Sequence, residues 1–301
     1  MNAVLVVDKP AGMTSHDVVN RVRRILGQRS VGHLGTLDPA ATGVLPLVLG
    51  SLTRLSQFYG ASEKQYEGWI RFGQATDTYD AEGIPVGPPQ TARFTAEKLE
   101  AATSRFRGSI QQMPPAFSAK KVQGVPAYKL ARKKKDVELT AVEVNIHEFR
   151  ILEFTGERAR FHARVSSGTY MRSIAHDLGQ MLGCGAHLES LRRTAHGEFT
   201  LNDAHTLEAI QAGVLNNERE VLFIHPRKLL PQLPSVTATP EQIARIRAGR
   251  TVNLPELSRS HQVKVFQGQS DLIAIVTRMA GTLFHPKIVL APEAESVAQS
   301  D

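Results

Sequence analysis

Runs of apolar residues and their spacing predict the first strand and two amphipathic helices. Residues 3–7 (AVLVV) form a continuous apolar run, which is typical of a buried strand. Apolar positions then recur at helical spacing from Val18 to Leu26, with Ser15 as the expected N-cap and Gly27 as the expected end. The same spacing returns over residues 171–182, so we expect a second helix there, again ended by a glycine.

The remaining patterns predict a larger first domain and a small second one. We expect strands at 65–73, 137–154 and 159–166 and a short helix at 95–106. Three prolines in segment 231–240 indicate a domain boundary.

A β-rich module follows this boundary. Thr239 and Gln242 form a capping box that predicts the start of a helix. Three strands are expected after it, at 261–266, 271–278 and 284–290. The sequence is therefore divided into a domain at 1–232, a module at 235–292 and a loose tail at 293–301.

Composition is typical of a globular protein without a membrane segment. The 301 residues are 42% hydrophobic, which is too apolar for a disordered chain. Apolar runs such as 3–7 and 272–276 are far shorter than the about 20 residues of a spanning helix. No basic leader precedes the first run, so we expect no secretory signal, and the single cysteine favours a reducing cytoplasm. Cys184 is the only cysteine, which excludes an internal disulfide and a cysteine-based zinc site, and no histidine spacing indicates a metal site.

The charge balance favours a polyanionic partner. Lys and Arg (36) exceed Asp and Glu (29), giving a net charge of +7. The irregular segment 113–135 is rich in basic residues, among them Lys120, Lys121, Lys129 and Arg132. We interpret it as an arm that follows nucleic-acid phosphates, with a solvated linker as the alternative. The arginines of the first predicted helix allow the same two interpretations: a face exposed to solvent, or a face that contacts phosphates.

Motifs of several common enzyme classes are absent from the sequence. Residues 43–51 have the glycine spacing of a phosphate-binding loop but no lysine. Residues 183–185 lack the third glycine of a dinucleotide site and follow a predicted helix. No G-x-S-x-G elbow occurs. Nucleotide hydrolysis, hydride transfer and serine-hydrolase chemistry therefore have little support.

The loop from Gly32 to Gly43 (GHLGTLDPAATG) is the candidate for catalysis. Its three glycines permit backbone conformations that other residues resist. Pro39 biases Asp38 towards an extended conformation. The loop would then present one carboxylate on a stiff backbone, whereas the alternative is a simple Asp-Pro turn.

This loop, extended to GHLGTLDPAATGVLP, resembles the catalytic motif of the TruB family of tRNA pseudouridine synthases. VVDKPAGMTSHDVV resembles the family's N-terminal signature, and KQYEG and TDTYDAEG resemble a later strand and its loop. SSGTYMRSIAHDLG and LGCGAHLESLRRT resemble the late catalytic block. The match in order and spacing covers residues 4–230, and the C-terminal module more loosely resembles a PUA-type RNA-binding module.

The resemblance implies a fold and a reaction. The fold is α+β, with a mixed, largely antiparallel sheet flanked by helices and a small PUA-like β-rich module. The reaction isomerises uridine to pseudouridine at position 55 in the T arm of tRNA and uses no cofactor or metal. It also implies that the enzyme acts in the cytoplasm as a monomer, without an obligate protein partner. A non-catalytic RNA binder or tRNA folding chaperone that uses the same surface is the alternative.

The resemblance also assigns roles to residues. Asp38 is the catalytic aspartate, as nucleophile at C1′ or C6 or as base for the sugar, and Arg172 pairs with it. Tyr66 stacks on the target base and is the candidate acceptor of the C5 proton. Further positions are expected to line the pocket or to aid base extrusion: Lys9, His33, Tyr170 and Leu191. Besides the arm, the expected contacts to the RNA backbone are Arg192 and Arg193.

Overall fold

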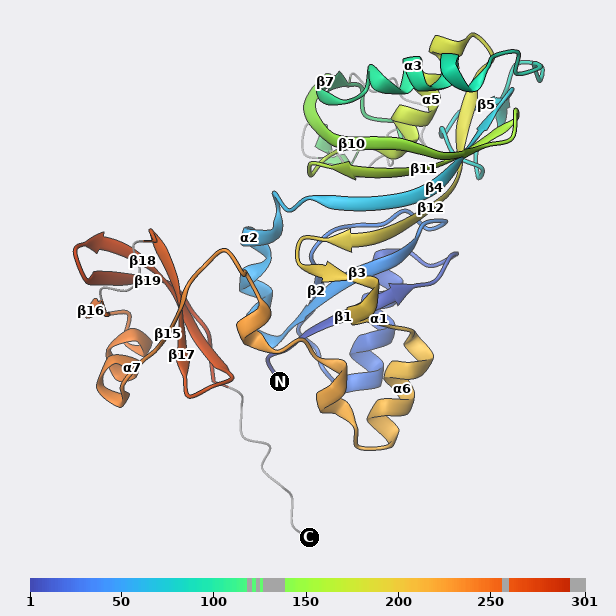
Figure 1. Cartoon of the computed structure of the whole chain (residues 1–301). Coiled ribbons are helices and arrows are strands. Elements are labelled where there is room, and N and C mark those ends of the chain that lie inside the picture. The colour runs from blue at the N-terminus through green and yellow to red at the C-terminus, as the bar shows by residue number, and fades with distance from the viewer. Residues whose placement is uncertain (118–120, 123–124, 127–138, 256–259, 293–301) are drawn as a thin grey trace.

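Two β-sheets organise the chain (Figure 1). The computed structural model describes residues 1–117, 121–122, 125–126, 139–255 and 260–292. Within these residues, most strands up to His205 build a large sheet, and the strands from Ser235 onward build a smaller one. No helix in this described part is both long and apolar enough to span a membrane.

The large sheet is mixed and largely antiparallel, as expected. Its strands are, in spatial order, β14 (Ala204–His205), β1 (Val4–Lys9), β3 (Thr42–Leu49), β12 (Ala186–His196), β4 (Lys64–Phe72), β11 (Arg158–Val165), β10 (Val142–Phe154) and β7 (Gly108–Gln112), with β2 (Val31–His33) beside β3 and β13 (Phe199–Thr200) beside β12. Only two of the described pairings in this sheet are parallel, those of β1 with β14 and of β3 with β12.

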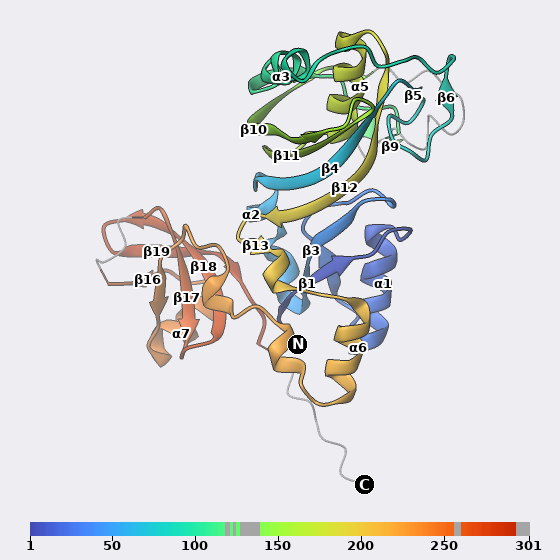
Figure 2. The same ribbon diagram turned by 45° about the vertical axis from the view of Figure 1, so that its right-hand side comes forward.

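Helices cover the large sheet in two groups (Figure 2). Helix α1 (Ser15–Leu26) packs with α6 (Leu207–Leu215) near β1. Helix α3 (Ala96–Ser104) packs with α5 (Met171–Leu182), and this pair contacts β10 and β12. Apolar side chains of all four helices join one buried cluster with the sheet, which fixes the helices to it.

The remaining elements are short. They are α2 (Ser56–Tyr59), the 3-10 turns η1 (Gly50–Leu55), η2 (Leu201–Asp203), η3 (Arg219–Leu222) and η4 (Pro226–Lys228), and the strand pairs β5 (Ala75–Thr76) with β6 (Pro85–Val86) and β8 (Lys121–Val122) with β9 (Val125–Pro126).

The C-terminal sheet confirms the expected β-rich module. Its order is β15 (Ser235–Thr237), β17 (Gln262–Gln267), β18 (Asp271–Ala280), β19 (Leu283–Val289) and β16 (Val252–Asn253), with helix α7 (Pro240–Arg247) beside it. The predicted capping box of Thr239 and Gln242 starts α7.

The two sheets share a hydrophobic cluster. Val4 and Val6 of β1 belong to the same buried group as Phe266 and Ile288 of the C-terminal sheet. The ammonium of Lys264 is buried between the two parts and donates to the carbonyl of Leu229 at 2.6 Å. The two parts of the chain therefore share a packed interior, while most residues of the proline-rich boundary 231–240 stay exposed.

One expectation about local structure needs correction, and some elements were missed. Ser15 is not the N-cap of α1, because Thr14 accepts from the backbone of Asp17 and completes a capping box with it. The hydroxyl of Ser15 instead exchanges hydrogen bonds with the backbone of Leu37, at 2.8 and 3.2 Å. Strands β3 and β12 and helix α6 were not predicted from the sequence pattern.

Candidate active site

The Asp38 loop joins β2 to β3 and is held from several sides. Besides the Ser15 contacts at Leu37, the amide of Leu34 donates to the carbonyl of Pro46 at 3.0 Å. The buried ammonium of Lys9 donates to the carbonyl of Pro39 at 2.9 Å. These bonds fix the backbone on both sides of Asp38, so its carboxylate is presented in one position.

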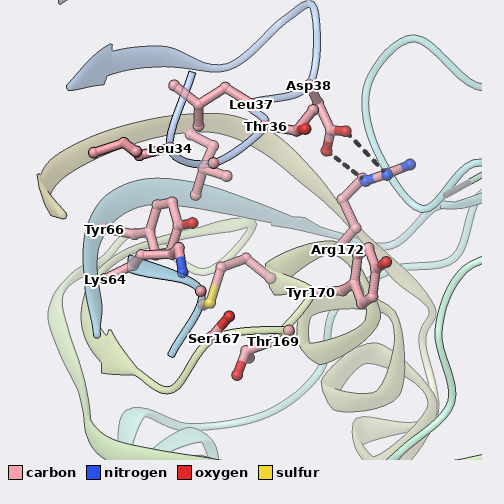
Figure 3. A pocket seen from close by; sticks show the side chains of 15 residues that line it. Leu34, Thr36, Leu37, Asp38, Lys64, Tyr66, Ser167, Thr169, Tyr170 and Arg172 are labelled. Atoms are coloured by element: carbon pink, nitrogen blue, oxygen red, sulfur yellow. Dashed lines mark hydrogen bonds and ion pairs between the residues drawn. The ribbon is translucent and has the colours of Figure 1, made fainter. Parts of the chain in front are cut away.

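Arg172 meets the carboxylate of Asp38 from the first turn of α5, although 134 positions separate the two residues. Its Nε lies 2.9 Å from Oδ2, and its Nη2 donates to Oδ1 at 3.2 Å (Figure 3). The Arg172 side chain is only 6% exposed. A guanidinium that engages both oxygens fixes the orientation of a carboxylate as well as neutralising its charge.

Opposing effects set the protonation of Asp38. Burial raises the pKa of the Asp38 carboxyl above its ordinary value, and the charge of Arg172 opposes this rise. The nearby carboxylate of Asp80 adds to the rise. The Asp38 side chain is still 41% exposed, since it opens onto a cavity, and water there weakens the effect of burial.

Asp80 is a site residue that the sequence analysis did not single out. Its Oδ2 lies 3.4 Å from Nη1 of Arg172, so one guanidinium contacts two carboxylates. The neighbouring Tyr79 has a φ of +65° and stacks on His176 of α5 at 3.9 Å between ring centroids. A left-handed backbone at a tyrosine is unfavourable and persists where its surroundings fix it. The signal available in the sequence was an acidic residue in TDTYDAEG.

A cavity of about 240 Å³ lies beside Asp38 (Figure 3). Side chains from separate parts of the chain line it, among them Leu34, Leu37, Asp38, Lys64, Tyr66, Tyr170, Arg172 and Leu191. Its walls combine aromatic and aliphatic side chains with a carboxylate and two cationic groups. That chemistry suits a planar polar ring whose reacting atoms face Asp38.

The structure brings four of the predicted site residues to this cavity besides Asp38. Tyr66 of β4 is 7% exposed, and Leu191 of β12 is half-buried. Tyr170 precedes α5, and its backbone N–H and C=O both bond the side-chain amide of Gln112, at 2.8 and 3.0 Å. This paired bond holds the start of α5 and therefore Arg172.

Lys64 also lines the cavity and was missed, although it begins the KQYEG motif. Its ammonium donates to the carbonyl of Ser62 at 3.0 Å. Burial, helped by the charge of Arg193, lowers the pKa of Lys64 to about 8. The ammonium can therefore change charge close to neutral pH.

Three predicted residues lie outside the cavity lining. His33 is half-buried on β2, and burial lowers its pKa. Lys9 is fully buried, and its ammonium donates hydrogen bonds to the backbone carbonyls of Pro10 and Pro39. Arg192 of β12 is 41% exposed and forms a two-point contact with Asp8, at 2.7 and 3.0 Å.

The expectation for Arg193 needs correction. Its side chain is fully buried, so it does not offer its guanidinium to an RNA phosphate. Lys120, Lys129 and Arg132 of the predicted arm lie outside the described residues. Lys121 falls in β8, where only the backbone is described. The described residues hold no cluster of side chains suited to a metal ion.

Comparison with known proteins assigns this arrangement to a family. Residues 23–171 match the family model described as "TruB family pseudouridylate synthase (N terminal domain)". Residues 172–231 match "tRNA pseudouridylate synthase B C-terminal domain". Two curated relatives carry the name tRNA pseudouridine synthase B. The one from Solibacter usitatus is 50% identical over 96% of this chain and 100% of its own length, and the one from Azoarcus sp. is 39% identical over 97% and 96%.

Solved structures show the same fold. One is described as an H/ACA RNP bound to a substrate RNA containing 2′-deoxyuridine; it has a TM-score of 0.72 at 23% identity, covering 96% of this chain and 85% of the other. A chain of a Cbf5-Nop10-Gar1 complex has a TM-score of 0.71 at 24% identity, covering 96% and 85%. At this identity the likeness concerns the fold alone. The family models and the near full-length relatives establish that the chain belongs to the TruB family of pseudouridylate synthases and is an RNA pseudouridine synthase.

Proposed function

We propose that this chain isomerises uridine to pseudouridine at position 55 in the T arm of tRNA, acting through Asp38 on a flipped-out base and without a cofactor. The observation that carries the proposal is the Asp38 carboxylate, held at two points by Arg172 at the wall of a cavity that Tyr66 also lines. The name and near full-length coverage of the curated relatives support tRNA as the substrate.

The chemistry requires an ionised carboxylate. The glycosidic C–N bond breaks, the base turns, and a bond forms between C1′ and C5, so nothing is oxidised or reduced. Asp38 acts as a nucleophile at C1′ or C6, or as a base towards the sugar. The Arg172 guanidinium favours the ionised form of Asp38 against the effect of burial. Tyr66 stacks on the base and takes the C5 proton once C5 is bonded to C1′.

Extrusion of the uridine has to be compensated by new contacts. Unstacking a nucleotide costs a few kcal/mol, and stacking on Tyr66 returns about 1–3 kcal/mol. We infer that His33 fills the vacated place in the stack, since imidazole rings stack on bases. Phosphate contacts supply the remainder, from Lys64, Arg192 and the basic residues of the 113–135 arm.

The C-terminal module would extend the RNA contact as a PUA-like domain. Its helix α7 and the residues after it carry three exposed arginines, Arg245, Arg247 and Arg250. We also infer that the chain acts alone as a monomer. The purified chain should then be active without added proteins and should elute at the mass of one chain in size-exclusion chromatography with light scattering.

A tRNA transcript with tritium at C5 of its uridines tests the reaction. The chain should release tritium, and the Asp38→Ala variant should release none while keeping most of its affinity for the transcript. Asp177→Ala is the matched control, because Asp177 is an exposed aspartate on α5 outside the cavity lining. A transcript with cytidine at position 55 should give no release if that position is the target.

The outcomes separate the alternatives. Binding without tritium release from any transcript would favour the non-catalytic RNA binder or chaperone. Release that persists with cytidine at position 55 would assign the enzyme another target. Release by the Asp38→Ala variant would overturn the role of the aspartate. Chelation by EDTA should leave the chemical step unchanged once the RNA is folded.

A further inference from the structure

A buried arginine on β12 connects the two groups to which the proposed reaction assigns chemistry. Arg193 is fully buried, and its guanidinium makes three hydrogen bonds. Its Nε donates to the carbonyl of Val44 at 2.7 Å, just beyond the Asp38 loop. Its Nη2 and Nη1 donate to the carbonyls of Gly35 and Thr36, at 3.0 and 3.3 Å, just before Asp38. The guanidinium therefore fastens both sides of the catalytic loop.

The same residue faces Tyr66. Strands β12 and β4 are antiparallel, and Arg193 lies directly opposite Tyr66 in their register. Directly opposed residues in an antiparallel pair project their side chains from the same face of the sheet. Burial lowers the pKa of the Arg193 guanidinium, and the nearby Tyr66 phenol opposes this lowering.

The hydrogen bonds of Arg193 do not neutralise its charge. All three hydrogen bonds go to neutral backbone carbonyls rather than to a carboxylate. Burying a guanidinium without a counter-ion is unfavourable, whereas an anion beside it is stabilised. Its field also reaches Lys64 and His196, whose pKa values it helps to lower. The Tyr66 side of the cavity is therefore set to favour negative charge.

We infer that Arg193 is a positioning residue, which aims the Tyr66 oxygen at C5 of the bound base and stabilises negative charge on that oxygen while it fixes the Asp38 loop. The inference rests on the proposed function. In the step concerned, C5 already carries its new bond to C1′. The C5–H bond breaks and its electron pair forms the C5–C6 double bond, while the π pair of the C6–N1 double bond moves to N1, which takes a proton from water. The C5 proton passes to the Tyr66 phenolate. The resulting phenol returns the proton to water before the next turnover.

A hydrogen-isotope experiment tests this role. Transcripts with protium or deuterium at uridine C5 are compared in single-turnover pseudouridine formation. We expect Arg193→Gln to lower the rate roughly 10- to 100-fold, within the range that acid–base groups contribute. We also expect the ratio of protium to deuterium rates to rise above that of the unmodified chain, because removal of the C5 proton becomes limiting. Arg193→Lys, which keeps the charge, should restore part of the rate.

The Tyr66→Phe background separates positioning from structural support. If Arg193 acts through the phenol, Arg193→Gln should slow Tyr66→Phe much less than it slows the unmodified chain. An unchanged isotope ratio together with additive losses would overturn the inference and leave Arg193 as a support of the loop. If Arg193→Gln does not fold, as judged by circular dichroism, the same comparison is made with Arg193→Met, which also removes the charge, and the same two readings decide. Release of C5 tritium by Asp38→Ala would instead overturn the proposed function.

Discussion

At the scale of single residues, the site depends on how charge is shared. Arg172 contacts Asp38 and Asp80 at once, and Arg193 has no carboxylate among its hydrogen-bond partners. In the first arrangement, Arg172 favours the ionised form of Asp38 against the effect of burial. The second places a buried positive charge, without a carboxylate partner, opposite Tyr66 on the neighbouring strand. The reacting ring would lie between a carboxylate and a field that favours another anion.

The pH dependence of activity should report the Asp38–Arg172 pair. Asp38 has a raised pKa, so activity is lost as the pH falls through that value and the carboxylate gains a proton. In Arg172→Gln the opposing charge is gone and the pKa rises further. The acidic limb of kcat/KM, measured by tritium release, should therefore move to higher pH. The control Arg192→Gln, which breaks the contact with Asp8, should leave this limb in place.

Lys64 should make the affinity for RNA depend on pH above neutrality, whereas Asp38 governs the acidic side. Its pKa of about 8 means that the ammonium is charged below that pH and neutral above it. Affinity for tRNA, measured by filter binding with Asp38→Ala to prevent turnover, should fall as the pH rises from 7 to 9. Adding Lys64→Gln should flatten the dependence, whereas Lys98→Gln, at an exposed position on α3, should not. A slope that survives Lys64→Gln would assign it to another group.

At the scale of elements, the parallel pairing of β3 with β12 positions the Asp38 loop. The two strands are parallel neighbours at Thr42 and Gly43, opposite Arg192 and Arg193. Gly43 has a φ of +98°, and a Cβ there would lie 2.2 Å from the carbonyl oxygen of Arg193. Only glycine permits this approach, which closes the Asp38 loop against the sheet.

Gly43→Ala should therefore be strongly destabilising. Both the left-handed backbone and the clash with a backbone oxygen oppose it, and we expect a loss in the free energy of unfolding above the about 1–3 kcal/mol typical of strained backbone alone. Gly27→Ala is the control, since Gly27 also has a positive φ but open space around it. Urea unfolding of both variants measures the difference. Equal losses would show that the contact with Arg193 is unimportant.

At the scale of the whole molecule, the two sheets should unfold together. Phe266 of β17 is fully buried in the cluster that also contains Val4 and Val6 of β1. Phe266→Ala should lower the free energy of unfolding by about 3–5 kcal/mol, because it leaves a cavity in that cluster. Trp69, the only tryptophan, lies on β4 of the large sheet and reports its unfolding by fluorescence.

The urea midpoint of the Trp69 signal should fall in Phe266→Ala. The control Met279→Ala changes an exposed residue of β18 and should stay within about 0.5 kcal/mol of the unmodified chain. A Trp69 transition that ignores Phe266→Ala would mean that the C-terminal sheet unfolds independently.

The sequence predicted elements whose patterns are regular. Helices α1 and α5 follow a single periodicity with a glycine at the end, and β11 alternates regularly. Strand β10 was predicted although it has two register shifts against β11. Strand β12 was not predicted, and register shifts at Leu188–Ser190 and Arg193–Ala195 break its period of two. Strand β3 contains Pro46, which is typical of loops or edge strands.

The site could be predicted only in part, and mainly through the resemblance. From the sequence motifs alone, Asp38, Tyr66 and Arg172 were predicted to belong to one site. They did not indicate the burial of Arg193, since an arginine next to another arginine is more typical of a surface. Its partners are backbone carbonyls of a distant loop, and backbone carries no signature in the sequence.

The sharing of one cluster by β1 and the C-terminal sheet has a consequence for biosynthesis. The ribosome synthesises Val4 and Val6 first, whereas Phe266 and Ile288, which belong to the same buried cluster, are synthesised almost last. The parallel partner of β1, β14, also arrives only near residue 204. The cluster around the first strand therefore stays incomplete through most of translation, so its completion depends on late, long-range contacts, and a stalled nascent chain exposes apolar surface.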